Sequence, residues 1–244
     1  MRVQRFEQAA ALASALAADL IGRIQRTPRL VIGLATGRTP MLLYRELRLK
    51  TAAQGVDWSL VHTLNLDEFV GAGAVGQRYR DFMQEELFAH VNLDERHIHF
   101  LDGRAADLGA ECDRYERTIA ELGGIDVQIL GIGVNGHIGF NEPGIALHPR
   151  THVARLELST RARNTWLFDG AVERVPELAL SMGIETIVDA REIVLLATGA
   201  EKAEAVQGMI EGPVTPTLPA SVLQRHKSVT VMVDGDAAGR LSRR

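Results

Sequence analysis

The sequence is poor in cysteine, in aromatic side chains and in long apolar runs. Cys112 is the only cysteine among 244 residues, which excludes an intramolecular disulfide and a cysteine-rich metal site. A reducing, cytoplasmic location is therefore expected. The alanine-rich N-terminal run carries Glu7 and Asp19, and its leucines recur every fourth residue. This pattern favours an amphipathic helix over a secretory signal or a membrane span.

An excess of positive charge is also lacking. The chain has 27 Lys and Arg against 31 Asp and Glu, a formal net charge of −4, and no long basic block. Neither a nucleic acid nor an anionic membrane is therefore an expected partner, and an anionic small substrate would need a local basic pocket. The length suffices for one large core, and with no repeat or linker visible we expect a single domain over residues 1–244.

What the chain does have is a regular alternation of apolar, β-branched runs with helical patterns. The runs cover residues 29–34, 60–66, 97–100, 178–183, 192–198 and 229–233, together with one that starts at Ile125. This alternation predicts an α/β fold: a single doubly wound, Rossmann-like, mostly parallel sheet of about seven strands with helices on both faces. In such a sheet ligands bind at the carboxyl ends of the strands.

The first candidate site is the turn after the first run. It reads Thr36, Gly37, Arg38, Thr39 and Pro40, and we expect Thr39 to be the N-cap and Pro40 the first position of a helix. A turn of this kind presents backbone N–H groups and the positive end of a helix, which suits a phosphate. An ordinary capped turn is the alternative, but Arg38 favours an anion.

Acids, a lysine and two histidines follow other runs. Asp67 and Glu68 end the second run, where a paired acid suits proton transfer, although a turn cap is the alternative. Lys202 is expected in the first turn of a helix, where its positive charge is repelled by the helix dipole. Binding of an anionic ligand would explain a lysine at this position, and a solvated surface lysine is the alternative. His97 and His99 share one strand face, but no third ligand is visible near them, and no metal site is expected.

The stretch 125–144 contains a glycine motif. Residues 131–136 read GIGVNG and match G-x-G-x-x-G, a dinucleotide fingerprint that must open a helix. No helical period follows, and we expect no nucleotide cofactor. His137 and Glu142 come next, an imidazole and a carboxylate that suit acid–base chemistry near neutral pH, whereas a buried structural pair is the alternative.

Together these segments resemble the glucosamine-6-phosphate deaminases, of the superfamily that also contains the 6-phosphogluconolactonases. Four blocks carry the resemblance: residues 33–40, 65–71, 131–144 and 219–224. The sequences LDEFVG and GHIGFNEPG are typical of the deaminases, whereas a lactonase would continue differently after its Gly-His.

The resemblance implies conversion of glucosamine 6-phosphate to fructose 6-phosphate and ammonia, without cofactor or metal. His137 would assist opening of the sugar ring, Asp67 would carry a proton between C2 and C1, and Glu142 would hold the imidazole. Asn135 stands where the best-known members have an aspartate, which would leave His137 less basic.

The same resemblance implies a phosphate site. The turn at residues 36–39 would cradle the phosphate, Lys202 would neutralise it, and Gly136 would leave space for the sugar. Trp166 stands where family members carry a phosphate-binding arginine, and our hypothesis is that Arg38, together with Arg78, replaces it.

Other functions stay open at this point. They are a galactosamine-6-phosphate deaminase, a lactone hydrolase of the 6-phosphogluconolactonase type, and a sugar-phosphate sensor without catalysis. The presence of Asp67, His137 and Glu142 together speaks against a sensor, which needs no proton shuttle. The expected partner is a small phosphorylated amino sugar, bound by a monomer or a small homo-oligomer.

Overall fold

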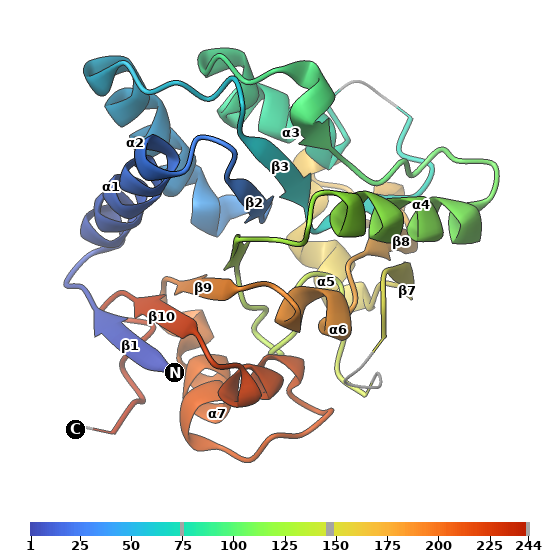
Figure 1. Ribbon diagram of the computed structural model, residues 1–244. Helices are drawn as coiled ribbons and strands as arrows, with labels where there is room; N and C mark the ends of the chain where they lie inside the picture. Colours follow the sequence, from blue (N-terminus) through green and yellow to red (C-terminus); the bar gives the residue numbers. More distant parts are fainter. Residues whose placement is uncertain (74–75, 145–148, 243–244) are drawn as a thin grey trace.

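A seven-stranded parallel sheet forms the centre of the molecule (Figure 1). The computed structural model describes residues 1–73, 76–144 and 149–242. The strand order is β1-β10-β9-β6-β2-β3-β5, with all neighbours parallel. The strands are β1 (Arg2–Arg5), β2 (Val31–Leu34), β3 (His62–Asn65), β5 (Ile98–His99), β6 (Val127–Leu130), β9 (Glu192–Ala197) and β10 (Val229–Val233). The predicted α/β class with a seven-stranded sheet is confirmed.

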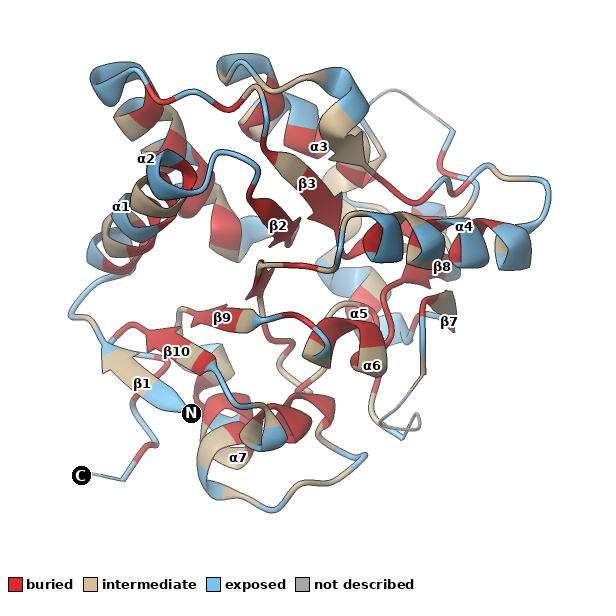
Figure 2. Ribbon diagram, in the orientation of Figure 1, coloured by how far each residue is buried: buried red, intermediate tan, exposed pale blue. Residues whose placement is uncertain are grey.

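Helices cover both faces of this sheet, as predicted. On one face α1 (Ala9–Arg26), α2 (Arg38–Gln54) and α3 (Tyr79–Glu86) pack into one apolar core. On the other face α4 (Leu108–Glu121), α6 (Ile184–Val188) and α7 (Ala203–Glu211) pack into a second. Figure 2 shows α1 and α4 with buried residues toward the sheet and exposed residues on the outer side. No helix in the described ranges is long and apolar enough to cross a bilayer.

A second, antiparallel sheet was not predicted. It has the order β4-β8-β7, with β4 (Asp67–Phe69), β8 (Leu178–Ser181) and β7 (His152–Arg155). Residues 178–183 were expected in the central sheet, and this placement is wrong, because β1 takes the seventh position. The chain changes sheets at Leu66, whose N–H bonds to Leu34 while its carbonyl accepts the N–H of Met182.

The start of α2 also differs from the prediction. Thr39 is not the N-cap, because the helix begins at Arg38 and Gly37 precedes it as the cap. Gly37 has a φ of 101°, a conformation that favours glycine and turns the chain into the helix two residues early. Pro40 then lies in the first turn, where its missing N–H costs no hydrogen bond.

The remaining elements are short. They are α5 (Leu158–Arg163) and the 3-10 helices η1 (Phe88–His90), η2 (Glu95–His97), η3 (Thr165–Leu167), η4 (Val172–Arg174), η5 (Ala200–Lys202) and η6 (Pro219–Arg225). Cys112 is buried on α4.

Three histidines meet at the amino end of the central sheet. His62, on β3, lies beside His97 and His99, a neighbour that the sequence analysis did not connect with them. Its Nδ1 is 3.1 Å from Nε2 of His99, and its ring centroid is 4.1 Å from that of His97. The approaching nitrogens bond to each other, and among the described residues no three side chains are placed to hold a metal.

This histidine cluster predicts a pH-dependent stability. Desolvation, with the nearby His62 and His97, lowers the pKa of His99 from 6.5 to about 4. As the pH falls from 6.5 to about 4, the unfolded chain therefore takes up a proton that the folded chain does not, and the free energy of unfolding decreases. We expect His99→Gln to weaken this dependence in urea unfolding curves. His90→Gln, at an exposed site, is the control; an unchanged slope in His99→Gln would contradict the prediction.

Candidate active site

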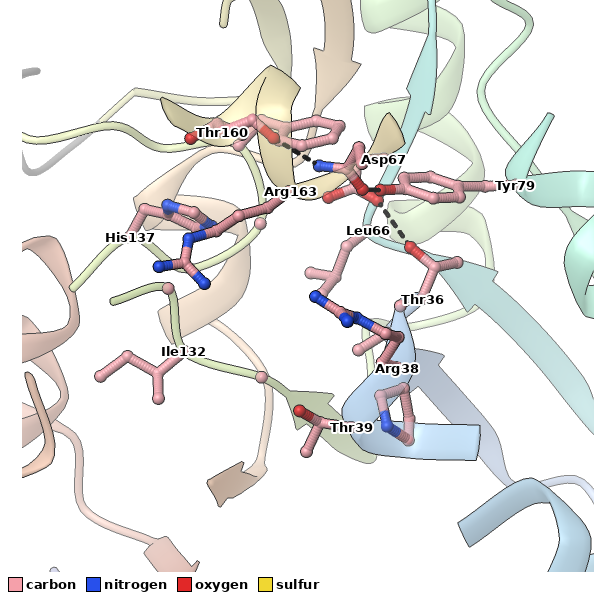
Figure 3. A pocket seen from close by; sticks show the side chains of 18 of the residues that line it. Thr36, Arg38, Thr39, Leu66, Asp67, Tyr79, Ile132, His137, Thr160 and Arg163 are labelled. Carbon is pink, nitrogen blue, oxygen red and sulfur yellow. Dashed lines mark hydrogen bonds between the residues drawn. The ribbon is translucent and has the colours of Figure 1, made fainter. Parts of the chain in front are cut away.

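A cavity of about 240 Å³ lies at the carboxyl ends of β2, β3 and β6. Its wall is formed by the turn at residues 35–40, by Asp67, by the glycine-rich segment with His137, by the end of α5, and by Lys202 (Figure 3). The structure thus brings together four segments that the sequence analysis had singled out separately. The expectation that polar strand ends meet at one edge of the sheet agrees with this arrangement.

Asp67 is a buried carboxyl in the cavity wall. Only 6% of the residue is exposed, and the hydroxyl of Thr36 donates to its Oδ1 at 3.4 Å. Burial, reinforced by the charge of Glu68, raises the pKa of Asp67 from 3.8 to about 8. A carboxyl with this pKa is a far stronger base, once ionised, than an exposed aspartate, which suits proton transfer from carbon.

Glu68 does not share that role, although the sequence suggested a paired acid. Its carboxylate accepts the backbone N–H groups of Phe69, Tyr79 and Arg80 at 2.9 to 3.0 Å. Burial, only partly offset by these bonds, raises the pKa of Glu68 to about 6. Glu68 therefore satisfies the first N–H groups of α3, and it lines a different cavity from Asp67.

His137 lies across the cavity from Asp67, and its ring is held by Asn135 and Glu142. Its Nδ1 lies 2.7 Å from Oδ1 of Asn135 and 3.5 Å from Oε2 of Glu142. Asn135 donates its amide nitrogen to Glu142 at 3.0 Å, so its oxygen must accept from the imidazole. The proton of neutral His137 is thereby held on Nδ1, and Nε2 is left free to accept another.

Glu142 is the acid behind this imidazole. Its side chain is 4% exposed. Burial opposes its ionisation, but hydrogen bonds from His137, Thr160 and Asn135 outweigh burial and lower the pKa of Glu142 to about 2. The carboxylate is therefore charged throughout the physiological range and stabilises a protonated His137.

The glycine motif makes a tight turn and opens no helix. The N–H of Gly133 bonds to the carbonyl of His137 at 2.8 Å, and that of Gly136 bonds to Gly133 at 3.0 Å. A Cβ on Gly133 would lie 2.3 Å from Nδ1 of His137. Gly133 therefore lets the imidazole pack against the backbone, a different use from cradling a pyrophosphate.

Two predicted ligand-binding residues do not line the cavity. The carbonyl of Gly136 accepts the N–H of Ala220 at 2.9 Å, and a Cβ there would meet Leu218 at 2.6 Å. Arg78 forms an ion pair with Asp81 at 2.5 Å and lines a different cavity. The geometry thus supports a packing role for Gly136 and gives no support to Arg78 as a phosphate ligand.

The basic side chains gather at one part of the cavity. Lys202 donates to the carbonyl of Ile132 at 2.7 Å, and desolvation, with the charges of Arg163 and Arg38, lowers its pKa. Figure 3 shows the side chains of Arg38 and Arg163 directed into the cavity. Neither arginine has a carboxylate partner within the described parts of the chain, whereas Glu201 lies beside Lys202. An anionic ligand would complete this arrangement.

Sequence reasoning missed three side chains of the site. These are Arg163 and Asn164, in a segment without clear periodicity, and Tyr79. Tyr79 is buried, and its hydroxyl donates to Oδ1 of Asn164 at 2.8 Å. In the sequence, Arg163 is connected with the site only by its closeness to Trp166, which follows three residues later and stands where family members carry a phosphate-binding arginine. Trp166 also lines the cavity.

Comparisons with known proteins identify the family of the chain. A family described as glucosamine-6-phosphate isomerases/6-phosphogluconolactonase matches residues 4–232. The chain is 48% identical to glucosamine-6-phosphate deaminase 2 of Bacillus subtilis, over 98% of this chain and 95% of that protein. It is 46% identical to glucosamine-6-phosphate deaminase of Cellvibrio japonicus, over 99% of this chain and 92% of that protein.

Solved structures give the same result. A monomeric glucosamine-6-phosphate deaminase superposes with a TM-score of 0.95 at 39% identity, covering 98% of this chain and 99% of that one. The 6-phosphogluconolactonase of Trypanosoma brucei superposes with a TM-score of 0.78 at 20% identity, covering 99% of this chain and 98% of that one. This similarity shows a shared fold. Because the family model matches residues 4–232 and a relative at 48% identity covers nearly the whole chain, the chain belongs to the family of glucosamine-6-phosphate isomerases and 6-phosphogluconolactonases.

Proposed function

We propose that this protein is a glucosamine-6-phosphate deaminase, which converts glucosamine 6-phosphate and water to fructose 6-phosphate and ammonia. One observation carries the proposal: a buried carboxyl of raised pKa, on Asp67, faces an imidazole with a free Nε2, on His137, across one cavity with a cationic end. This arrangement suits proton transfers at neighbouring atoms of a phosphorylated sugar. Curated relatives at 42% to 48% identity bear the same name.

Ring opening is the first step, and His137 is suited to it. Opening a pyranose requires a proton to leave the anomeric hydroxyl and a proton to reach the ring oxygen. Nε2 of His137 accepts and returns a proton, while Asn135 and Glu142 fix the ring and stabilise its charged form. The product of this step is an open-chain aldehyde with an amine on C2.

Isomerisation and loss of ammonia follow at Asp67. The ionised carboxylate removes the proton from C2, which gives an enolamine, and returns it to C1, which gives an imine at C2. Addition of water to C2 then expels ammonia and leaves the ketose. A protonated amine on the bound sugar lowers the pKa of Asp67 by charge attraction, and this favours the ionised carboxylate that the step requires.

The phosphate is placed at the cationic end of the cavity in this proposal. The turn at residues 36–39 offers hydroxyls and the free N–H groups at the start of α2, and Arg38 and Lys202 supply positive charge. The predicted partner, a small phosphorylated amino sugar, is therefore retained. We also propose a cytoplasmic monomer, on the ground of the lone reduced Cys112 and the monomeric structural relative.

The proposal is tested by incubating the protein separately with glucosamine 6-phosphate, galactosamine 6-phosphate and 6-phosphogluconolactone. We expect ammonia and fructose 6-phosphate from the first. Asp67→Asn should lower kcat by a factor of about 10³, because it removes the base, while substrate binding is retained. Acid release from the lactone alone, or binding of the amino sugar without turnover, would contradict the proposal.

Arg38 gives a second test. We expect Arg38→Ala to raise KM for glucosamine 6-phosphate roughly tenfold, because a hydrogen bond between two charged groups is lost, with little change in kcat. Arg45→Ala, on the same helix but outside the cavity, is the matched control. An unchanged KM in Arg38→Ala would show that this arginine does not bind the phosphate.

A further inference from the structure

The end of α5 places a second guanidinium in the cavity. Arg163 is the last residue of this helix, and it lines the cavity with Arg38 and Lys202 (Figure 3). We propose that Arg163 binds the phosphate group of the substrate and thereby selects phosphorylated over unphosphorylated amino sugars. This inference rests on the proposed function and assigns a residue of the same site.

The helix that carries Arg163 is fixed to the catalytic groups at its start. Oε1 of Glu142 accepts the backbone N–H of Glu157, the residue before α5, at 3.4 Å. Thr160, within α5, also donates its hydroxyl to Glu142. The acid that holds His137 therefore also holds the helix.

Asn164 fixes the other end of α5. Its Oδ1 accepts the hydroxyl of Tyr79 at 2.8 Å, and its Nδ2 donates to the carbonyl of Thr160 at 2.9 Å. Tyr79 is buried beside Asp67 in the cavity wall. Arg163, which directly precedes Asn164, thus extends from backbone that is fixed to both sides of the site, and this placement limits the entropy lost when its side chain binds a ligand.

Arg163 differs from Arg161, the other arginine of the helix, because its side chain forms no hydrogen bond with the described part of the protein. Arg161 donates to the carbonyls of Val175 and Val172 at 3.0 and 3.1 Å and holds the following segment. Within the described residues, Arg163 has neither a hydrogen bond nor an ion pair of this kind, and its neighbours in the cavity include two further cations, Arg38 and Lys202. Three cations converge here, with Glu201 as the acid that lines the same part of the cavity.

The chemistry of the three cations favours a phosphate over a sugar hydroxyl. A guanidinium binds two oxygens of a dianion at once, whereas an ammonium such as that of Lys202 acts as a point charge. Glu201 is one acid beside three cations and offsets only part of the repulsion among Arg38, Arg163 and Lys202, so an anionic ligand is favoured here. A phosphate dianion is the only such group on the proposed substrate. Arg163 should therefore contribute to binding throughout the reaction, which affects KM and leaves kcat nearly unchanged.

The test compares Arg163→Gln and Arg163→Lys with the wild type in steady-state deamination. We expect Arg163→Gln to raise KM for glucosamine 6-phosphate at least tenfold with kcat within about threefold, and Arg163→Lys to recover part of the loss. Arg96→Gln, at an exposed position outside the cavity, is the control and should behave as the wild type. An unchanged KM in Arg163→Gln, or a loss confined to kcat, would overturn the inference.

A binding measurement separates this inference from the proposed function. Calorimetric titration with fructose 6-phosphate requires no turnover, and we expect Arg163→Gln to bind it at least tenfold more weakly than the wild type. If the wild type released no ammonia but this difference were found, the proposed function would fail and the role of Arg163 would stand. Equal affinity of both proteins, or no binding by the wild type, would overturn the role of Arg163.

Discussion

The burial of one carboxyl, where the chain leaves the central sheet, is the constraint on which the site depends. Leu66 bonds to β2 on one side and to the segment after β8 on the other, so Asp67 is fixed between two sheets. The hydroxyl of Thr36 donates a hydrogen bond to the carboxyl of Asp67, and burial largely excludes water from this group. The raised pKa follows from this position and from the adjacent charge of Glu68, which is itself fixed by capping α3. The fold thus fixes the position of a carboxyl whose ionised form is destabilised by its surroundings.

The two functional carboxyls have opposite environments. Glu142 is also buried, yet three hydrogen-bond donors keep it ionised and lower its pKa to about 2, whereas Asp67 has one weak donor and a pKa raised to about 8. Carboxyls whose pKa values are driven apart in this way are suited to different roles. Glu142 can act only as a fixed charge behind His137, while Asp67 can gain and lose a proton within the working range of an enzyme.

The sequence allowed the central sheet and much of the site to be predicted, because local signals coincide there. The apolar runs form the strands, and the turn at residues 36–39, Asp67 and His137 follow the carboxyl ends of three of them. In a parallel sheet these ends lie at the same edge. What could not be predicted depends on contacts between distant segments. The second sheet depends on the pairing of β8 with both β4 and β7, which are distant from it in sequence. The position of Arg163 in the cavity depends on the docking of α5 on Tyr79 and Glu142.

Folding keeps Asp67 out of water, and unfolding measurements test this burial without substrate. Because its pKa rises from 3.8 to about 8 on folding, the folded wild type loses stability as the pH rises through this window, since the unfolded chain then releases a proton that the folded chain retains. Asp67→Asn carries no such proton. We predict that the Tm of Asp67→Asn, relative to that of the wild type, is higher at about pH 8.5 than at about pH 5. A Tm difference that is the same at both pH values would contradict it.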